Sequence, residues 1–212
     1  MAHCDIAWPN HDHSWHCAYG LWHINQAQTE TASALSLVVV RKKRKEMAFT
    51  IPENLPKDLY PLAWLIGTWS GKGQGEYKDV APFQFAHEVT FNHDGRNFLT
   101  YYSRSWIIDD NNEIIKQAAS ETGFWNIREG KILDVMLAHS NGHAESWVGI
   151  VDGPRIQLAF DGVINGVTAK QVSGGHRLYG LVEGELFFAY DMQTPTKELQ
   201  PHIWSTLARK QD

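Results

Sequence analysis

The feature of this chain that most constrains its fold is a succession of strand-length segments separated by tight turns, which runs from Gly67 almost to the end. Within the segments apolar and polar residues alternate, which is the pattern of a half-buried β-strand. The connectors are short and rich in Gly, Asn and Asp: Glu129-Gly130, Asn141-Gly142, Asp152-Gly153, Asp161-Gly162 to Gly166, and Glu183-Gly184. Asn-Gly and Asp-Gly supply the positive φ that tight hairpin turns demand.

Ten strands are predicted on this basis, and no long helix. They are Gly67–Tyr77, Phe83–Phe91, Phe98–Ile108, Glu121–Arg128, Lys131–His139, His143–Val151, Arg155–Phe160, Ala169–Tyr179, Glu185–Met192 and Pro201–Arg209. Ahead of them, Lys57 to Ile66 is expected to form one or two short helical turns. An antiparallel up-and-down meander of this size closes its edges into a β-barrel. We therefore predict an all-β barrel of about ten strands, large enough to enclose a ligand cavity.

Composition excludes several other classes of protein. Hydrophobic residues make up 43% of the chain, and the formal net charge is −5 with a pI near 6.1, so nucleic-acid binding by the whole chain is not expected. No apolar run approaches the roughly 20 residues of a membrane-spanning helix. Both cysteines lie within the first twenty residues, so no disulfide is expected in the main body, which is consistent with a cytoplasmic location.

Residues 1–46 differ from the rest of the chain, because they contain both cysteines and five histidines and show no strand-length alternation. The cluster from His11 to Cys17 lacks the paired ligand spacing of a structural zinc site. The basic run Arg41 to Lys45 is interpreted as a solvated linker, a polyanion patch, or the translation of a purine-rich ribosome-binding site before a true start at Met47. We expect 1–46 to be a disordered extension or a leader, and 47–212 to be one barrel domain.

The segment from Gly67 to Tyr77 matches GxWxGxGxG through Gly67, Trp69, Gly71 and Gly73. It is not a dinucleotide-binding fingerprint, because no strand–turn–helix unit surrounds it. Alternate glycines remove every side chain from one face, which lets a strand bend sharply or lets a ligand approach the backbone. Barrel curvature is the favoured interpretation of these glycines.

This motif, together with Leu199-Gln200-Pro201-His202-Ile203, resembles the nitrobindin family. The resemblance covers 61–210. Further matching segments are Ala81-Pro82-Phe83, Phe98 to Tyr101, Glu121 to Phe124, Leu137-Ala138-His139, Ala169-Lys170 and Leu207 to Lys210. Nitrobindins are antiparallel β-barrels that hold ferric heme b through one proximal His, bind nitric oxide and convert peroxynitrite to nitrate. The resemblance implies that His202 is the axial iron ligand and that Lys170 lies near a heme propionate.

Considered without the resemblance, His202 is a plausible ligand, because a neutral imidazole is a good donor to heme iron. Strand alternation places His202 on one face with Trp204, Thr206 and Ala208, a mostly apolar face suited to a porphyrin. Pro201 lacks an N–H and suits a strand start beside a pocket. A lone His on an apolar face is more often a core residue than a metal ligand. The family resemblance makes the ligand the favoured interpretation of His202.

Other residues give weaker signals. His139, His87 and His143 are candidates for the distal side of a heme, although His143 is expected in a hairpin turn and His87 is expected to face water. The chain has Lys78-Asp79 where many relatives have Pro-Thr, and Ala118-Ala119-Ser120 where some carry bulkier residues, so a roomier pocket is expected. Carboxylates are scattered along the strands, at Glu76, Glu88, Glu121 and Glu145, and no pair of acids can be chosen for a hydrolase.

The function that the resemblance implies is a peroxynitrite isomerase: a ferric heme b protein that also binds nitric oxide and needs no catalytic residue beyond the iron ligand. Two alternatives stay open. One is a carrier of a fatty acid or other lipophile in the barrel cavity, and the other is a heme-based nitric oxide store or sensor without turnover. We expect small-molecule partners, no nucleic acid, no membrane, and a monomer or homodimer.

Overall fold

The computed structural model describes residues 51–78, 80–167 and 169–211. All of these residues belong to the second of two units in the chain, Glu46–Asp212. The expectations for 1–46, including the His/Cys cluster and the basic run, lie outside the described residues. Among the described residues, neither helix has the length or apolar character needed to span a membrane.

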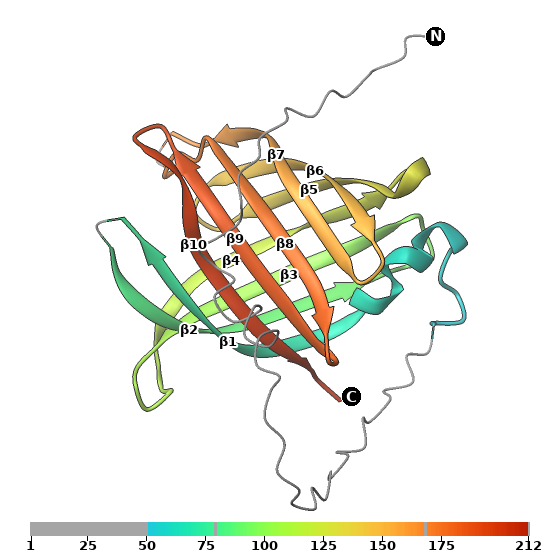
Figure 1. Cartoon of the computed structure of the whole chain (residues 1–212), viewed down its shortest axis with the longest axis horizontal. Coiled ribbons are helices and arrows are strands. Elements are labelled where there is room, and N and C mark those ends of the chain that lie inside the picture. The colour runs from blue at the N-terminus through green and yellow to red at the C-terminus, as the bar shows by residue number, and fades with distance from the viewer. Residues whose placement is uncertain (1–50, 79, 168, 212) are drawn as a thin grey trace, which may run out of the picture. The chain divides into compact units, whose positions relative to one another are not determined.

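The described residues form a closed, ten-stranded antiparallel β-barrel (Figure 1). Each strand pairs with its neighbours along the chain, and the first strand pairs with the last to close the barrel. The strands are β1 (Gly67–Tyr77), β2 (Val80–Asn92), β3 (Phe98–Ile108), β4 (Ile114–Ile127), β5 (Ile132–His139), β6 (His143–Asp152), β7 (Arg155–Asn165), β8 (Gly174–Val182), β9 (Glu185–Thr194) and β10 (Lys197–Arg209). Two 3-10 helices, η1 (Lys57–Leu65) and η2 (Glu129–Lys131), complete the described elements. The predicted fold class and the short helical segment are both confirmed.

Some predicted boundaries were wrong. The pair Asp161-Gly162 lies inside β7 and forms no turn, because Gly162 pairs with Ser146 and Phe160 with Trp147, which leaves Asp161 as the extra residue of a β-bulge. A bulge absorbs one residue without ending the strand, so turn-forming residues there do not mark a hairpin. The next strand, β8, begins at Gly174 and not at Ala169. Strand β4 begins seven residues before Glu121, at Ile114.

The two ends of the barrel have different characters. At the first end, which we call the η1 end, the buried Leu59, Leu62 and Leu65 pack with Trp69 in the apolar core. Trp69 Nε1 donates a hydrogen bond to the Leu65 carbonyl at 2.7 Å, which joins η1 to β1. Each of these buried leucines contributes roughly 1.5–3 kcal/mol of transfer free energy. At the other end, which we call the pocket end, lie the connections β1–β2, β3–β4, β5–β6, β7–β8 and β9–β10.

The inward face of the barrel is apolar near the η1 end and polar toward the pocket end. Its buried polar residues are His87, Ser103, His143, Glu145, Arg177, Thr194 and Ser205. Because charges and polar groups are costly to bury unless they are paired, their concentration in one region marks it as the candidate site.

Candidate functional site

His202 lies at a β-bulge on β10, and this bulge turns its side chain into the barrel. Pro201 pairs with Asp191 and Ile203 pairs with Tyr190, so His202 is the extra residue between them. Farther along β10, Ser205 and Leu207 are buried on the inward face. Trp204, Thr206 and Ala208 therefore occupy the opposite, outward face. The predicted shared face was wrong, because a one-residue shift moves a side chain to the other side of a sheet.

Two tyrosines flank the His202 ring. It meets the Tyr77 ring edge-on at a centroid distance of 5.3 Å and the Tyr190 ring at 5.9 Å, both with an interplanar angle of 73°. The Nδ1 atom of His202 and the hydroxyls of both tyrosines are buried and have no hydrogen-bond partner. Buried polar atoms are nearly always paired, so three unpaired ones around a single position indicate a ligand site.

The imidazole of His202 is electrically neutral at physiological pH. Burial lowers its pKa to about 4, and the positive charges of Lys170 and Arg177 add to this, while a hydrogen bond with the Glu76 backbone acts in the opposite direction. Neutral imidazole is the form that donates a nitrogen lone pair to a metal. The environment thus keeps His202 ready to bind iron without first losing a proton.

Lys170 is exposed and lies close to the same site. Its Nζ atom lies 5.5 Å from the centroid of the Tyr77 ring, and Lys197 Nζ lies 4.7 Å from the same centroid. Beside them a hollow of about 280 Å³ opens at the pocket end; it is lined by Glu76, Tyr77, Lys78, Val80, Pro82, Gln200 and Pro201. Both predicted contact residues, His202 and Lys170, therefore approach Tyr77, although 32 residues separate them in the chain.

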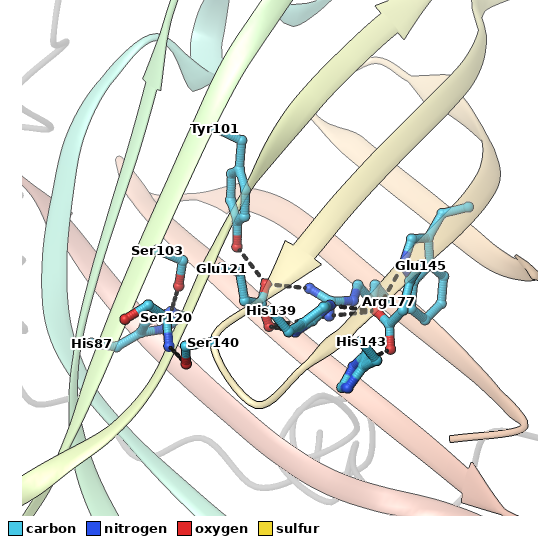
Figure 2. A network of polar contacts seen from close by, with 11 residues as sticks. His87, Tyr101, Ser103, Ser120, Glu121, His139, Ser140, His143, Glu145 and Arg177 are labelled. Atoms are coloured by element: carbon cyan, nitrogen blue, oxygen red, sulfur yellow. Dashed lines mark hydrogen bonds and ion pairs between the residues drawn. The ribbon is translucent and has the colours of Figure 1, made fainter. Parts of the chain in front are cut away.

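A second group of polar residues lies on the barrel wall opposite β10. Strand β5 is five steps from β10 in either direction around the barrel, so His139 and His202 stand on opposite walls near the same end. Nε2 of His139 lies 2.9 Å from Glu145 Oε2, and Nε2 of His143 lies 3.1 Å from Glu145 Oε1 (Figure 2). His143 is buried and is the first residue of β6, so its predicted place in the hairpin turn was wrong.

Arg177 holds the two carboxylates of this group together. Its side chain is fully buried and donates to Glu121 at 2.8 Å and to Glu145 at 3.3 Å. Burial by itself would raise the pKa of Glu121, but the charges of Arg177 and His139 lower it to about 2. Burial likewise opposes ionisation of Glu145, yet hydrogen bonds from His139 and His143 and the charge of Arg177 hold its pKa well below the usual range. Both carboxylates are therefore ionised. We call Glu121, His139, His143, Glu145 and Arg177 the acid–histidine cluster.

His87 faces the interior, so the expectation that it faces water was wrong. Its Nδ1 lies 2.8 Å from the Ser205 hydroxyl and its Nε2 lies 3.0 Å from the Ser103 hydroxyl. Burial lowers the pKa of His87 to about 4, partly offset by the charge of Glu121. Both ring nitrogens are engaged with protein groups, which makes His87 a satisfied core histidine.

The GxWxGxG motif serves close packing of β1 against its neighbours. A Cβ at Gly73 would lie 2.4 Å from the Phe85 ring and 2.5 Å from the Trp204 carbonyl oxygen, and one at Gly71 would lie 2.1 Å from the Thr206 carbonyl oxygen. Gly67, with φ of +125°, and the fully buried Trp69 lie at the η1 end, away from His202. The structure supports the interpretation of this motif as a structural element.

The sequence did not reveal that Glu121, Glu145 and Arg177 meet, nor that Tyr77 and Tyr190 flank His202. One signal was available for the charged residues. Each occupies an inward-facing position in a strand whose other inward residues are apolar or aromatic, and a charge in such a place needs a partner. The partners could not be chosen, because the three residues come from β4, β6 and β8.

Comparison with known proteins connects this site to a family. A family model described as a THAP4-like, heme-binding beta-barrel domain matches residues 58–209. The chain belongs to this family, the nitrobindins. It is 43% identical to a peroxynitrite isomerase of Nocardioides sp., covering 77% of this chain and all of that protein. It is 39% identical to a ferric nitrobindin-like protein of Cutibacterium acnes, covering 77% of this chain and 99% of that protein.

A solved structure supports the same assignment. The crystal structure of Rv2717c from M. tuberculosis superposes with a TM-score of 0.67 at 32% sequence identity, covering 74% of this chain and 99% of that one. Nitrobindins of this family bind heme, and the surroundings of His202 fit that group. They supply a neutral imidazole with an unpaired buried nitrogen, two aromatic rings beside it, and lysines at the edge of the pocket.

Proposed function

We propose that this protein holds ferric heme b through His202 and isomerises peroxynitrite to nitrate. The observation that carries the proposal is the unpaired, buried Nδ1 of a neutral His202 at the pocket end of a barrel from a heme-binding family. Relatives named peroxynitrite isomerase, at 43% and 42% identity, support the reaction. When bound, ferric heme supplies an iron with an open coordination position at which peroxynitrite can rearrange.

The residues of the chain have distinct tasks in this proposal. His202 would supply the nitrogen that holds the iron, and the bulge at His202 directs the ring into the barrel. The edge-on contacts with Tyr77 and Tyr190 fix the plane of the imidazole. Lys170, with its Nζ beside the Tyr77 ring, contributes positive charge where a propionate and an anionic substrate would enter. No general acid or base is required from the chain.

The test is a visible spectrum followed by a rate measurement. Heme-free protein mixed with one equivalent of hemin should give an intense Soret band that stays with the protein on gel filtration. Stopped-flow mixing with peroxynitrite should then show decay faster than with buffer, with nitrate as the product. A protein that retains no heme would favour the lipophile carrier. Retained heme without accelerated decay would favour a nitric oxide store or sensor.

A further inference from the structure

The hairpin between β5 and β6 brings two histidines face to face inside the barrel. Ala138 pairs with Ala144, so His139 and His143 follow as the next opposed residues, on either side of a three-residue turn. Their rings stack with centroids 4.1 Å apart and an interplanar angle of 24°. Glu145 lies two residues beyond His143, on the same inward face. One hairpin thus carries two imidazoles and a carboxylate.

The donor atoms of these residues already converge. Both Nε2 atoms lie against the Glu145 carboxylate, at 2.9 Å for His139 and 3.1 Å for His143. One ligand atom from each of the three residues falls within 4.8 Å of the others. Ligand atoms bound at about 2.0–2.1 Å to a tetrahedral zinc lie roughly 3.3 Å apart. His139 reaches Oε2 and His143 reaches Oε1, so an ion held by both imidazoles lies against the two oxygens of one carboxylate.

The groups behind these residues are those that support metal ligands. Glu121 Oε1 lies 3.5 Å from Nδ1 of His139, which is the arrangement of a carboxylate that orients a ligating histidine. On the other side, Trp147 Nε1 and Arg177 donate to Glu145 Oε2 at 3.1 Å and 3.3 Å. These two hydrogen bonds fix the carboxylate while its Oε1 atom faces His143.

The three side chains are also buried deeply enough to shield a bound ion from water. Their exposed fractions are 8% for His139, 4% for His143 and 1% for Glu145. The acid–histidine cluster also contains two ionised carboxylates and a single guanidinium, Arg177.

We propose that His139, His143 and Glu145 bind a divalent first-row transition-metal ion, with Zn²⁺ as the best fit. Two imidazoles and one carboxylate form the ligand set of open zinc sites, and a fourth position is left for water. A metal-bound Nε2 carries no proton, so the N–H of each imidazole lies on Nδ1, which in His139 faces Glu121. The site is separate from His202, because β5 and β10 stand on opposite walls of the barrel. The proposal does not depend on heme binding.

The experiment uses heme-free, full-length protein in which every His and Cys between positions 3 and 23 is replaced by Ser, so that the first residues do not compete for metal. Zn²⁺ affinity is measured by competition with a chromophoric chelator, and coordination geometry by the visible spectrum of the Co²⁺ form. The test variants are H139Q and H143Q, which keep a side-chain donor near Glu145. H87Q is the matched control, since His87 is an equally buried histidine outside the hairpin.

The parent protein should bind one Zn²⁺ per chain and give a tetrahedral Co²⁺ spectrum. H139Q and H143Q should each weaken Zn²⁺ binding by at least about 10- to 100-fold. Loss of a supporting carboxylate already has an effect of that size, and loss of a ligand should have a larger one. H87Q should bind as the parent does. Thermal melts in EDTA check that each variant is folded. No Zn²⁺ binding by the parent, or unchanged affinity in both variants, would overturn the proposal. If neither variant folds, an octahedral Co²⁺ spectrum of the parent would overturn it.

Discussion

The two opposite walls of the barrel interior treat histidine in different ways. On β10, His202 stands between aromatic rings, and one of its ring nitrogens has no hydrogen-bond partner. On β5, both nitrogens of His139 face ionised carboxylates, Glu121 at 3.5 Å and Glu145 at 2.9 Å. Burial alone therefore does not decide what a histidine can bind. An apolar, aromatic wall leaves a ring nitrogen without a hydrogen-bond partner, whereas a charged wall surrounds the ring with carboxylates.

The largest effect is expected from removing a charge from the wall that carries the acid–histidine cluster, which we call the charged wall. Replacing Arg177 by Met leaves Glu121 and Glu145 buried without their guanidinium partner, which should cost about 3–5 kcal/mol. For a protein of this size the melting temperature should fall by about 6–20 °C. Arg128 offers a matched control, because it pairs with Asp134 at 2.8 Å with side chains 65% and 44% exposed. R128M should cost less than about 1 kcal/mol. Equal losses in the two variants would show that the interior charges are not coupled.

The wall that carries His202 between Tyr77 and Tyr190, which we call the aromatic wall, is tested by His202→Ala. Because the side chain makes few hydrogen bonds, the barrel should stay folded, with a melt within a few degrees of the parent. Heme dissociation should accelerate by on the order of 100-fold, and the spectrum of the proximal-histidine form should be lost. Added imidazole should restore part of that spectrum. H139A should leave the spectrum of heme-loaded protein unchanged. Loss of the spectrum in H139A but not in H202A would place the iron on His139.

The two walls should also respond to acid at different pH values. His202 has a lowered pKa, so the stability linked to it is present above about pH 6.5 and declines as the pH falls to about 4, where the folded ring takes up a proton. Iron ligation should therefore survive to about pH 5 and fail near pH 4. Glu121 has a pKa lowered to about 2, so its stabilisation persists until the pH approaches that value. A pH series followed by the Soret band and by far-UV circular dichroism should show heme loss before unfolding. Simultaneous loss would contradict this.

The smallest effect is expected from Lys170→Ala at the rim of the aromatic wall. An exposed ammonium near a propionate contributes under about 1 kcal/mol, so heme dissociation should accelerate by about 2- to 5-fold. The coordination spectrum should not change. K57A, on η1 at the other end, should have no effect on the dissociation rate. An unchanged rate in K170A, measured by transfer of heme to an acceptor protein, would remove Lys170 from the site.

The barrel could be predicted from the residues alone, because hairpin turns and alternation are local properties. Gly142, Gly153 and Gly184 adopt the positive φ that their turns predicted, and the strands between them pair in chain order. The motifs also carried the family and, with it, the prediction of His202 and Lys170. Local rules failed at Asp161-Gly162, where a bulge placed a turn-like pair inside a strand.

The direction of the His202 side chain and the set of residues around His139 depend on how the strands pack together. Alternation assigned His202 to the face of Trp204, and a single extra residue at the bulge reversed that assignment. No local pattern marks such a bulge, since its position depends on how β10 fits against β9. The acid–histidine cluster is likewise assembled from β4, β5, β6 and β8. Its charges find partners only when the barrel closes, because pairing across strands depends on register and not on spacing along the chain.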